Sequence, residues 1–440
     1  MPLEQRALFI ENFVWRDGSR FGFSAPRSLA AAASALPSLS GQFAMHLQQD
    51  GRHLLARDPL GVNKLFFTLS AGGQIDSSNY LIELLRRGHR IDDTFSVPSG
   101  HAILADTTVK TLALTNYAHL AFNELSAPDQ GDGAWVDRIR CALDEAFRRI
   151  RAVSSGRPVY VTMSGGLDST TIALLARDYL TNIRGVTFCV GRGKHFSQES
   201  EDVAFARKAA RDLDIPITVV TATPEDLLTL LDDVLMWGQD WRDFNVHSGL
   251  VNAAIGRALM NITPSAPACK RPLLLTGDTM NEMMADYTPV KRGEREFYGL
   301  PRVSRGRLRR FLVGGLDSGD REVGIFARMG LSAIQPYAMC AQAYLSIPAA
   351  FLERSDAKQR LAERLMGDRI PAYIRSRPKV RAQAGSANHI EGTLGALVDA
   401  GLEQDHLRRR WCDLFNLQAS DLRGLIRAGF YKFTTTFPTI

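Results

Sequence analysis

Residues 1–122 contain short apolar segments separated by glycine, aspartate and asparagine. The clearest of these segments are residues 42–48, 53–57, 65–68 and 101–104. Short apolar runs that alternate with turn-forming residues are typical of antiparallel strands that pack as sheets. The pattern therefore predicts a β-rich N-terminal part.

Residues 123–134 are polar and include Pro128, Gly131 and Gly133, which predicts a linker. A helical pattern over residues 136–149 follows. Strand-like segments then alternate with helical ones, the strands at residues 159–161, 185–190, 217–220 and 272–275 and the helices at 201–213, 224–236 and 249–260. This alternation predicts a doubly wound parallel sheet, with ligands at the carboxyl ends of its strands.

The remainder of the chain has the pattern of helices, at residues 348–367, 390–400 and 407–417. A chain of 440 residues that is 45% hydrophobic is long enough for two cores. We therefore expect an N-terminal domain over residues 1–122, a linker over 123–134, and a second domain over 135–440.

Charge and cysteine content narrow the class of protein. The net charge of +6 arises from 53 basic and 47 acidic residues that are interleaved, so nucleic acid is not the expected partner and anionic small molecules are. The five cysteines are far apart and lack CxxC spacing, which favours reduced thiols in the cytoplasm over disulfides or zinc. Neither a signal peptide nor a membrane-spanning segment is expected.

The segment VYVTMSGGLDST, residues 159–170, carries the most specific chemistry. A strand end, two glycines and a helix start would direct backbone N–H groups and the helix dipole at a phosphate. Hydroxyl side chains add donors, and an aspartate beside phosphates implies Mg²⁺. The candidate ATP- and pyrophosphate-binding residues here are Ser164, Gly165, Gly166, Leu167, Asp168, Ser169 and Thr170.

Two alternatives apply to this segment. It is not a Walker A loop, because no Gly-Lys-Ser/Thr follows. A serine- and glycine-rich turn that binds nothing is disfavoured, because strand, hydroxyls, glycines, aspartate and helix occur in the required order. A second GGLDS, residues 314–318, lacks the preceding serine and is interpreted as a loop.

The string SGGLDST resembles the pyrophosphate loop of the N-type ATP pyrophosphatases, which include asparagine synthetases, β-lactam synthetases, carbapenam synthetases and lasso-peptide cyclases. The resemblance implies that the loop holds the β- and γ-phosphates of ATP while a substrate carboxylate attacks the α-phosphate. AMP would then remain on the substrate, and ATP and Mg²⁺ are the expected cosubstrate and metal.

Three N-terminal segments, residues 41–47, 56–67 and 96–101, resemble the glutaminase domain of asparagine synthetases. The resemblance implies an Ntn-hydrolase-like αββα sandwich. Such a domain needs an N-terminal cysteine, whereas Met1 is followed by Pro2 and no cysteine precedes Cys141. We expect a degenerate scaffold that does not hydrolyse glutamine, so the amine would come from solution or from the substrate.

LLLTGDTMNE, residues 273–282, occupies the position of a second ATP-site motif of the same family. Gly277 would allow close approach of the adenylate. The family's second Mg²⁺-binding aspartate falls on Asn281, a weaker ligand, so Asp278 or Glu282 is an alternative. The metal candidates are thus Asp168, Asn281 and Glu282, although either carboxylate could instead cap a helix.

Residues 377–386, RPKVRAQAGS, look more like β-lactam synthetase than asparagine synthetase. The resemblance makes Lys379 the catalytic cation that stabilises negative charge on the acyl-adenylate and tetrahedral species. One such donor contributes ~3–4 kcal/mol, and a solvated surface lysine is the alternative. Lys358 matches the family's phosphate-binding lysine.

β-Lactam synthetases deprotonate the substrate amine with a Tyr–Glu pair. The tyrosine position falls on Asp278, and the glutamate position falls at or beside Asp320, with Glu322 two residues on. A carboxylate pair could accept the proton directly and attract an ammonium group. Loop solvation or helix capping is the alternative for Asp320 and Glu322.

Together these features predict an ATP- and Mg²⁺-dependent synthetase that adenylates a carboxylate and closes an intramolecular amide, such as a β-lactam, in a specialised metabolite. An intermolecular ligase that uses ammonia or another amine, or a peptide macrolactam cyclase, is the alternative. A degenerate protein that binds ATP or a partner without catalysis is a second alternative. The expected partner is a small amino-acid-like substrate.

Overall fold

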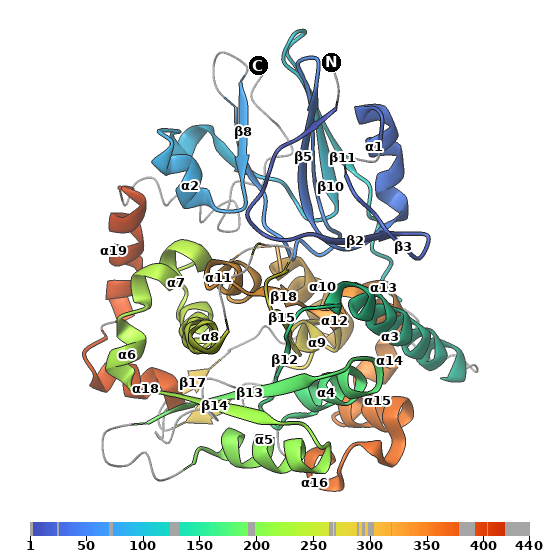
Figure 1. Cartoon of the computed structure of the whole chain (residues 1–440), viewed down its shortest axis with the longest axis vertical. Helices are drawn as coiled ribbons and strands as arrows, with labels where there is room; N and C mark the ends of the chain where they lie inside the picture. Colours follow the sequence, from blue (N-terminus) through green and yellow to red (C-terminus); the bar gives the residue numbers. More distant parts are fainter. Residues whose placement is uncertain are drawn as a thin grey trace.

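The computed structural model describes residues 3–23, 26–69, 74–123, 132–191, 199–263, 267, 270–287, 290–292, 295–297, 303–317, 319–377, 392–402 and 404–418. The N-terminal strands gather in one half of the molecule and a parallel sheet with its helices forms the other (Figure 1). Within the described ranges, no helix is both long and apolar enough to cross a membrane.

The N-terminal half contains three antiparallel sheets. The largest has the order β1-β5-β6-β10-β11, with β1 Glu4–Gln5, β5 Ala44–Gln49, β6 Arg52–Arg57, β10 His101–Asp106 and β11 Thr111–Asn116. The second sheet has the order β8-β7-β9, with β8 Ile75–Ser78, β7 Phe66–Leu69 and β9 Thr94–Ser96. The third has the order β3-β2-β4, with β3 Ser19–Arg20, β2 Phe13–Arg16 and β4 Leu39–Gln42. The predicted antiparallel strands are therefore confirmed.

The five-stranded sheet and the β8-β7-β9 sheet pack face to face around one hydrophobic cluster. Successive side chains of a strand point to opposite faces, so each strand contributes to two layers. Phe67 of β7 lies in the core between the sheets, while Phe66 belongs to the core on the other side. Helix α1, Leu29–Ala35, packs on the outer face of β5 and β6, and α2, Leu81–Arg86, packs on β7 and β8. The layers run helix, sheet, sheet, helix. The relationship to Ntn hydrolases remains a prediction from the sequence.

The parallel sheet has the order β14-β13-β12-β15-β18. Its strands are β12 Val159–Thr162, β13 Ile183–Val190, β14 Ile217–Ala222, β15 Leu273–Leu275 and β18 Ser332–Ile334. All four pairings are parallel, which confirms the predicted doubly wound sheet. The strand order reverses direction between β12 and β15, and ligands bind at such a switch point, outside the carboxyl ends of the strands.

The helices that connect the first strands follow the predicted alternation. They are α3 Asp132–Ser154, α4 Leu167–Tyr179, α5 Glu201–Asp212, α6 Pro224–Leu228, α7 Leu231–Gly238 and α8 Asp243–Ile262. Helix α3 begins inside the predicted linker, of which residues 124–131 lie outside the described ranges. The single helix predicted over residues 224–236 is wrong: the Thr229 hydroxyl donates to the Asp226 carbonyl at 2.6 Å and the chain turns before α7.

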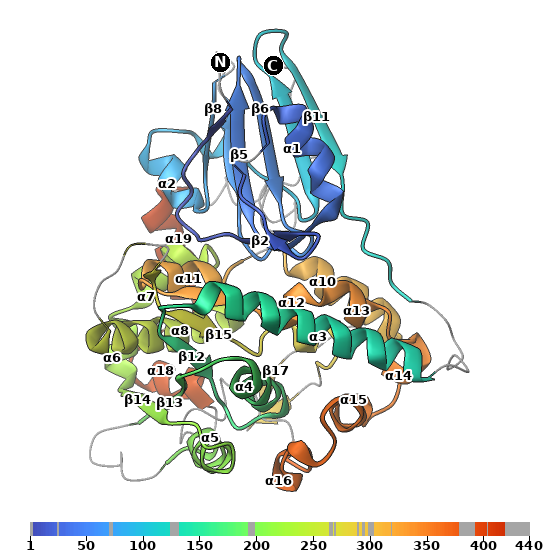
Figure 2. The same ribbon diagram turned by 45° about the vertical axis from the view of Figure 1, so that its right-hand side comes forward.

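The C-terminal third is helical where it is described (Figure 2). Its helices are α9 Met280–Met283, α10 Arg305–Gly315, α11 Val323–Arg328, α12 Pro336–Met339, α13 Ala341–Leu345, α14 Ala349–Leu352, α15 Ala357–Met366, α16 Ala372–Arg375, α18 Gly392–Asp399 and α19 Gln404–Phe415, with a hairpin of β16 Val290–Arg292 and β17 Arg295–Phe297. The second GGLDS, interpreted as a loop, begins inside α10, because Gly314 and Gly315 are its last residues.

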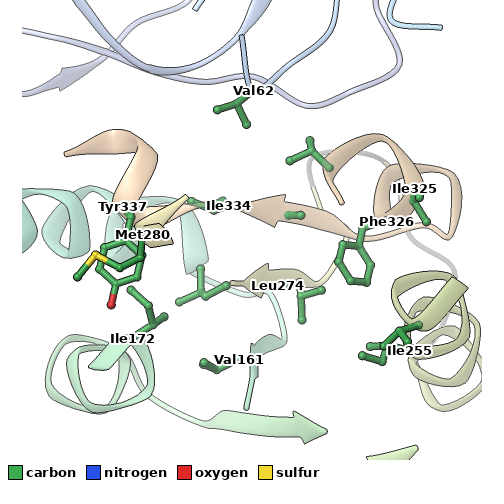
Figure 3. Packing of buried hydrophobic residues seen from close by; sticks show 14 of the residues in the cluster. Val62, Val161, Ile172, Ile255, Leu274, Met280, Ile325, Phe326, Ile334 and Tyr337 are labelled. Atoms are coloured by element: carbon green, nitrogen blue, oxygen red, sulfur yellow. The ribbon is translucent and has the colours of Figure 1, made fainter. Parts of the chain in front are cut away.

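The main hydrophobic core joins both halves of the chain. Val161 of β12, Leu274 of β15 and Ile334 of β18 stack across the sheet, and Val62 approaches them from the N-terminal half (Figure 3). Ile172 of α4 packs on the same cluster. The core therefore fixes the carboxyl ends of β12 and β15 side by side.

Candidate active site

The turn after β12 is shaped by backbone and hydroxyl contacts. Gly165 has φ +66°, a conformation that side chains with a β-carbon disfavour, and Leu167 begins α4. A β-carbon on Gly165 would lie 2.4 Å from Cβ of Phe205 in α5. Ser169 Oγ accepts from the Ser164 backbone N–H at 3.2 Å, which closes the turn over the start of α4.

The turn after β15 abuts this first turn. A β-carbon on Gly277 would lie 3.0 Å from the backbone nitrogen of Ser169, so glycine allows the two turns to approach closely. Beyond it, Thr279 has φ +72°, an unusual value for a β-branched residue. The strained backbone and the close approach both occur at the switch point between β12 and β15, at the carboxyl ends of strands where the sequence predicted ligands.

Lys358 of α15 joins the two turns. Its Nζ lies 2.5 Å from Oδ2 of Asp168, 2.8 Å from Oδ1 of Asn281 and 3.3 Å from Oδ2 of Asp286. Burial alone would lower the pKa of Lys358, but the two carboxylates outweigh it and raise that pKa above its usual value. Lys358, Asp168 and Asn281 were predicted separately for phosphate and metal binding. Because Lys358 bonds to both of the others, the three form one contact group.

Two polar atoms of the first turn are buried without a hydrogen-bond partner, Oδ1 of Asp168 and Oγ1 of Thr170. Buried polar atoms are nearly always hydrogen-bonded in folded proteins. Unpaired atoms beside a helix N-terminus, a lysine and a glycine turn are the groups that a triphosphate and its metal would use. The residues present therefore fit MgATP.

The predicted third metal ligand, Glu282, has partners on one carboxylate oxygen only: within the described residues its Oε2 is buried without a hydrogen-bond partner, as is Oδ1 of Asp168, whereas its Oε1 is engaged. It accepts from the Tyr287 hydroxyl at 2.5 Å and lies 3.4 Å from the Arg321 guanidinium. Within the described part of the chain, no group of three or more His, Cys, Asp and Glu side chains could hold a metal by itself. Mg²⁺ in nucleotide sites commonly takes one or two protein ligands plus phosphates, so Asp168 and Asn281 would suffice.

An acidic group lies next to the second turn. Arg321 donates to Asp278 from Nε at 3.1 Å and from Nη2 at 2.6 Å. Glu322 Oε2 accepts from the Thr276 hydroxyl at 2.9 Å and from the Gln335 amide at 2.5 Å. Burial, with a further contribution from Asp278, raises the pKa of Glu322 to about 8.

Both carboxylate oxygens of Asp320 bind backbone N–H groups at the start of α11. Its Oδ1 accepts from the Glu322 backbone N–H at 2.9 Å and its Oδ2 from that of Gly324 at 2.7 Å, at the start of α11. The capping alternative for this residue therefore describes the geometry, while the charge of Asp278 acts on Glu322 and on Glu282. The amine-facing pair suggested by the sequence would be Asp278 and Glu322.

The C-terminal Arg-Pro-Lys segment reaches the first turn through Arg377. Its guanidinium donates to the Ser164 carbonyl at 2.9 Å and to Oδ1 of Asp202 at 2.6 Å, and lies 4.2 Å from the ring centroid of Phe205. Lys379, predicted to be catalytic, lies outside the described residues. Arg377, two positions earlier, contacts the first turn through the Ser164 carbonyl.

Several site residues were not identified from the sequence. Arg321 stands between two acidic candidates in the string DRE, and that alternation was the available signal. Gln335 directly follows β18, a strand of only three residues whose pattern is too short to recognise. Thr276 and Arg377 lie inside the motifs LLLTGDTMNE and RPKVRAQAGS but were not singled out there, and Tyr287 carried no signal.

Comparison with protein families identifies the central region. Residues 138–313 match the family model described as "Asparagine synthase". This region contains the first turn, β12 to β15 and the second turn. No curated protein matches the chain.

Three solved structures are similar to part of the chain. The NH3-dependent NAD synthetase from Campylobacter jejuni subsp. jejuni NCTC 11168 has 16% identity over 35% of this chain and 61% of its own, with a TM-score of 0.24. The glutamine phosphoribosylpyrophosphate amidotransferase from B. subtilis has 12% identity over 45% and 36%, with a TM-score of 0.19. The glutamine-dependent NAD+ synthetase from Acinetobacter baumannii has 13% identity over 77% and 51%, with a TM-score of 0.30.

The chain thus spans between 36% and 61% of the length of these three proteins. With TM-scores this low, their likeness bears no weight for function. The functional interpretation rests on the family match and on the geometry of the two turns.

Proposed function

We propose that the protein is an ATP-dependent ligase that closes an amide within its substrate, a proposal supported by the match of residues 138–313 to the asparagine synthase family model. A substrate carboxylate displaces pyrophosphate from ATP to give an acyl-adenylate, and the substrate's own amine then displaces AMP. The amine loses one proton and the product is a lactam. The contact group of Lys358, Asp168 and Asn281 is the observation that carries this proposal.

The first turn provides the pyrophosphate site. Backbone N–H groups at the start of α4 and the hydroxyls of Ser164, Ser169 and Thr170 face the leaving diphosphate, and Lys358 neutralises its charge. Asp168 and Asn281 are suited to hold Mg²⁺, which when bound supplies further charge neutralisation on the phosphates.

The second turn provides the proton acceptor. Glu322 has a pKa of about 8, which is close to the operating pH that suits a general base. Asp278, held by Arg321, is close enough to raise the pKa of Glu322 and would orient an ammonium group. Lys379 would stabilise the negative charge that develops as the amine attacks, as the resemblance to β-lactam synthetases implies.

Pyrophosphate exchange tests the adenylation step. The protein is incubated with ATP, labelled pyrophosphate and a panel of amino acids that carry both a carboxylate and an amine. Substrate-dependent exchange is expected, and Lys358→Met should abolish it. No exchange with any member of the panel would favour a protein that binds ATP without catalysis.

Mass spectrometry of the product distinguishes ring closure from ligation. An intramolecular amide is lighter than its substrate by one water and gains no nitrogen. Incorporation of nitrogen from labelled ammonium, or of a second amine, would instead identify an intermolecular ligase. A ring closed within a peptide would identify a macrolactam cyclase.

A further inference from the structure

The N-terminal region, residues 3–123, contacts the acidic side of the candidate site through one loop. This loop, residues 316–322, of which 316–317 and 319–322 are described, leads from α10 to α11 and carries Arg321 and Glu322 at its end. Helices α10 and α11 lie on the side of the parallel sheet that faces the N-terminal strands (Figures 1 and 2).

Arg57, at the end of β6, is the strongest contact. Its side chain is fully buried, and its bonds within the N-terminal region go mainly to carbonyl oxygens, those of Asn63, Val97 and Gly61 at 2.9, 3.0 and 2.6 Å. Its ion pair is made to Oδ1 of Asp317 at 2.5 Å, across the interface. Removing one partner of such a buried pair is strongly destabilising, because it leaves the other charge desolvated and uncompensated.

Two further contacts fix the same end of the loop. The Ser99 backbone N–H donates to Oδ2 of Asp317 at 3.2 Å. Lys64, itself only 4% exposed, donates from Nζ to the Leu316 carbonyl at 2.6 Å. The loop is therefore held by three separate segments of the N-terminal region.

The other end of the loop is tied into the site. The Asp320 backbone N–H donates to the Gly238 carbonyl at 2.8 Å, and its carboxylate caps α11. The Tyr80 hydroxyl, from the N-terminal region, donates to the Gly324 carbonyl at 2.7 Å. A shift of the loop would move Arg321 and Glu322 relative to Asp278.

From this arrangement we propose that the N-terminal region is a positioning domain, in which Arg57 and Lys64 set the loop of residues 316–322 so that Arg321 and Glu322 meet the amine of the substrate. The proposal rests on the proposed function for its catalytic consequence. It assigns to this region a role in the second half-reaction that does not require glutamine hydrolysis.

Hydrogen exchange tests the positioning directly and requires no substrate. Arg57→Met keeps the apolar volume and removes the ion pair. Arg52→Met is the matched control, because Arg52 pairs with Asp106 on the exposed side of the same strand. Arg57→Met should increase amide exchange in residues 319–328 about tenfold or more, since local opening becomes easier. Arg52→Met should leave it unchanged.

Kinetics test the consequence for the site. Arg57→Met should lower kcat for amide formation about 10- to 100-fold, since small misplacement of reacting groups has effects of this size. Pyrophosphate exchange should stay within about twofold, because the first turn does not contact the loop's anchors. Asp317→Asn, which keeps the shape of the side chain, provides a milder variant if Arg57→Met does not fold.

Unchanged exchange at residues 319–328 in both Arg57→Met and Asp317→Asn would overturn the positioning role. An equal loss of both half-reactions would also overturn it, because that pattern indicates general damage. A wild-type protein without pyrophosphate exchange would count against the proposed function alone, since the hydrogen-exchange result is independent of it.

Discussion

Gly165 combines a left-handed backbone with a contact that leaves no space for a side chain. Gly165→Ala should therefore reduce the free energy of unfolding for two separate reasons. The backbone conformation costs about 1–2 kcal/mol for alanine, and overpacking against Phe205 adds about 1–3 kcal/mol. Denaturant unfolding measures the total, and pyrophosphate exchange should fall as the turn shifts.

Gly156 is the matched control for this prediction. It has φ +71° and nothing within 4 Å of an added β-carbon. Gly156→Ala should show the backbone cost alone. Equal destabilisation by the two substitutions would mean that the contact with α5 does not constrain the turn.

The raised pKa of Glu322 predicts how activity depends on pH. A general base must be deprotonated, so kcat should rise as pH passes through about 8. Glu322→Gln should lower kcat about 100-fold or more and remove this rise. A wild-type profile that is flat across pH 7 to 9 would assign the base elsewhere.

A rise in pH that deprotonates the same carboxyl group should increase activity but decrease the stability of the fold. The pKa of this group is about 8 in the folded protein and 4.5 in a free glutamate, so the folded state binds an extra proton between these values. The contribution of Glu322 to the free energy of unfolding is therefore full below about pH 4.5 and falls as pH rises toward 8. Glu322→Gln should remove this part of the pH dependence in denaturant titrations.

At the scale of elements, Arg377 couples three of them: the first turn, the start of α5 and the segment that leads to Lys379. Arg377→Met would remove the 2.6 Å contact of Asp202, which is 4% exposed, with the Arg377 guanidinium. Breaking a buried pair in this way costs about 3–5 kcal/mol. Thermal unfolding should show the loss, and the KM for ATP should rise.

A neighbouring arginine, Arg375, provides a control that distinguishes the contact of Arg377 with the first turn from a general effect of removing a positive charge. Arg375 is two positions earlier in the chain, and its guanidinium lies 3.5 Å from the fully exposed Asp368. Arg375→Met should change stability and the KM for ATP very little, because surface pairs contribute little. If both substitutions had the same effect, Arg377 would not act through the first turn.

At the scale of the whole molecule, the main core cluster includes residues from both halves of the chain. Trp15 and Tyr80 belong to it together with Val161 and Leu274. The Arg328 guanidinium adds a contact across the halves, 4.2 Å from the ring centroid of Tyr80 and 4.1 Å from that of Trp237. We therefore expect the two halves to unfold together.

Differential scanning calorimetry measures this cooperativity. A single transition, with calorimetric and van't Hoff enthalpies in agreement, is expected. Two separate transitions would show that the halves are independent in stability and would weaken the case for a shared core.

Local patterns determined much of this architecture. Strands β12 to β15 and helices α4, α5 and α8 follow directly from apolar periodicity, and the first turn follows from SGGLDST, because strand ends, glycine turns and helix starts depend on neighbouring residues. Elements of three or four residues, such as β18, and the break between α6 and α7 were missed. Their short patterns are decided by packing on the sheet and by side-chain bonds such as that of Thr229.

The sequence alone therefore determined the class of fold and which residues could bind a nucleotide. Only the tertiary structure decided how those residues combine: Lys358 with Asp168 and Asn281, Arg321 with Asp278, and Asp320 as a cap while Glu322 faces the site. The physical reason is that these partners are separated by as many as 190 positions. Their distances depend on the order of strands and the docking of loops, which periodicity along the chain does not encode.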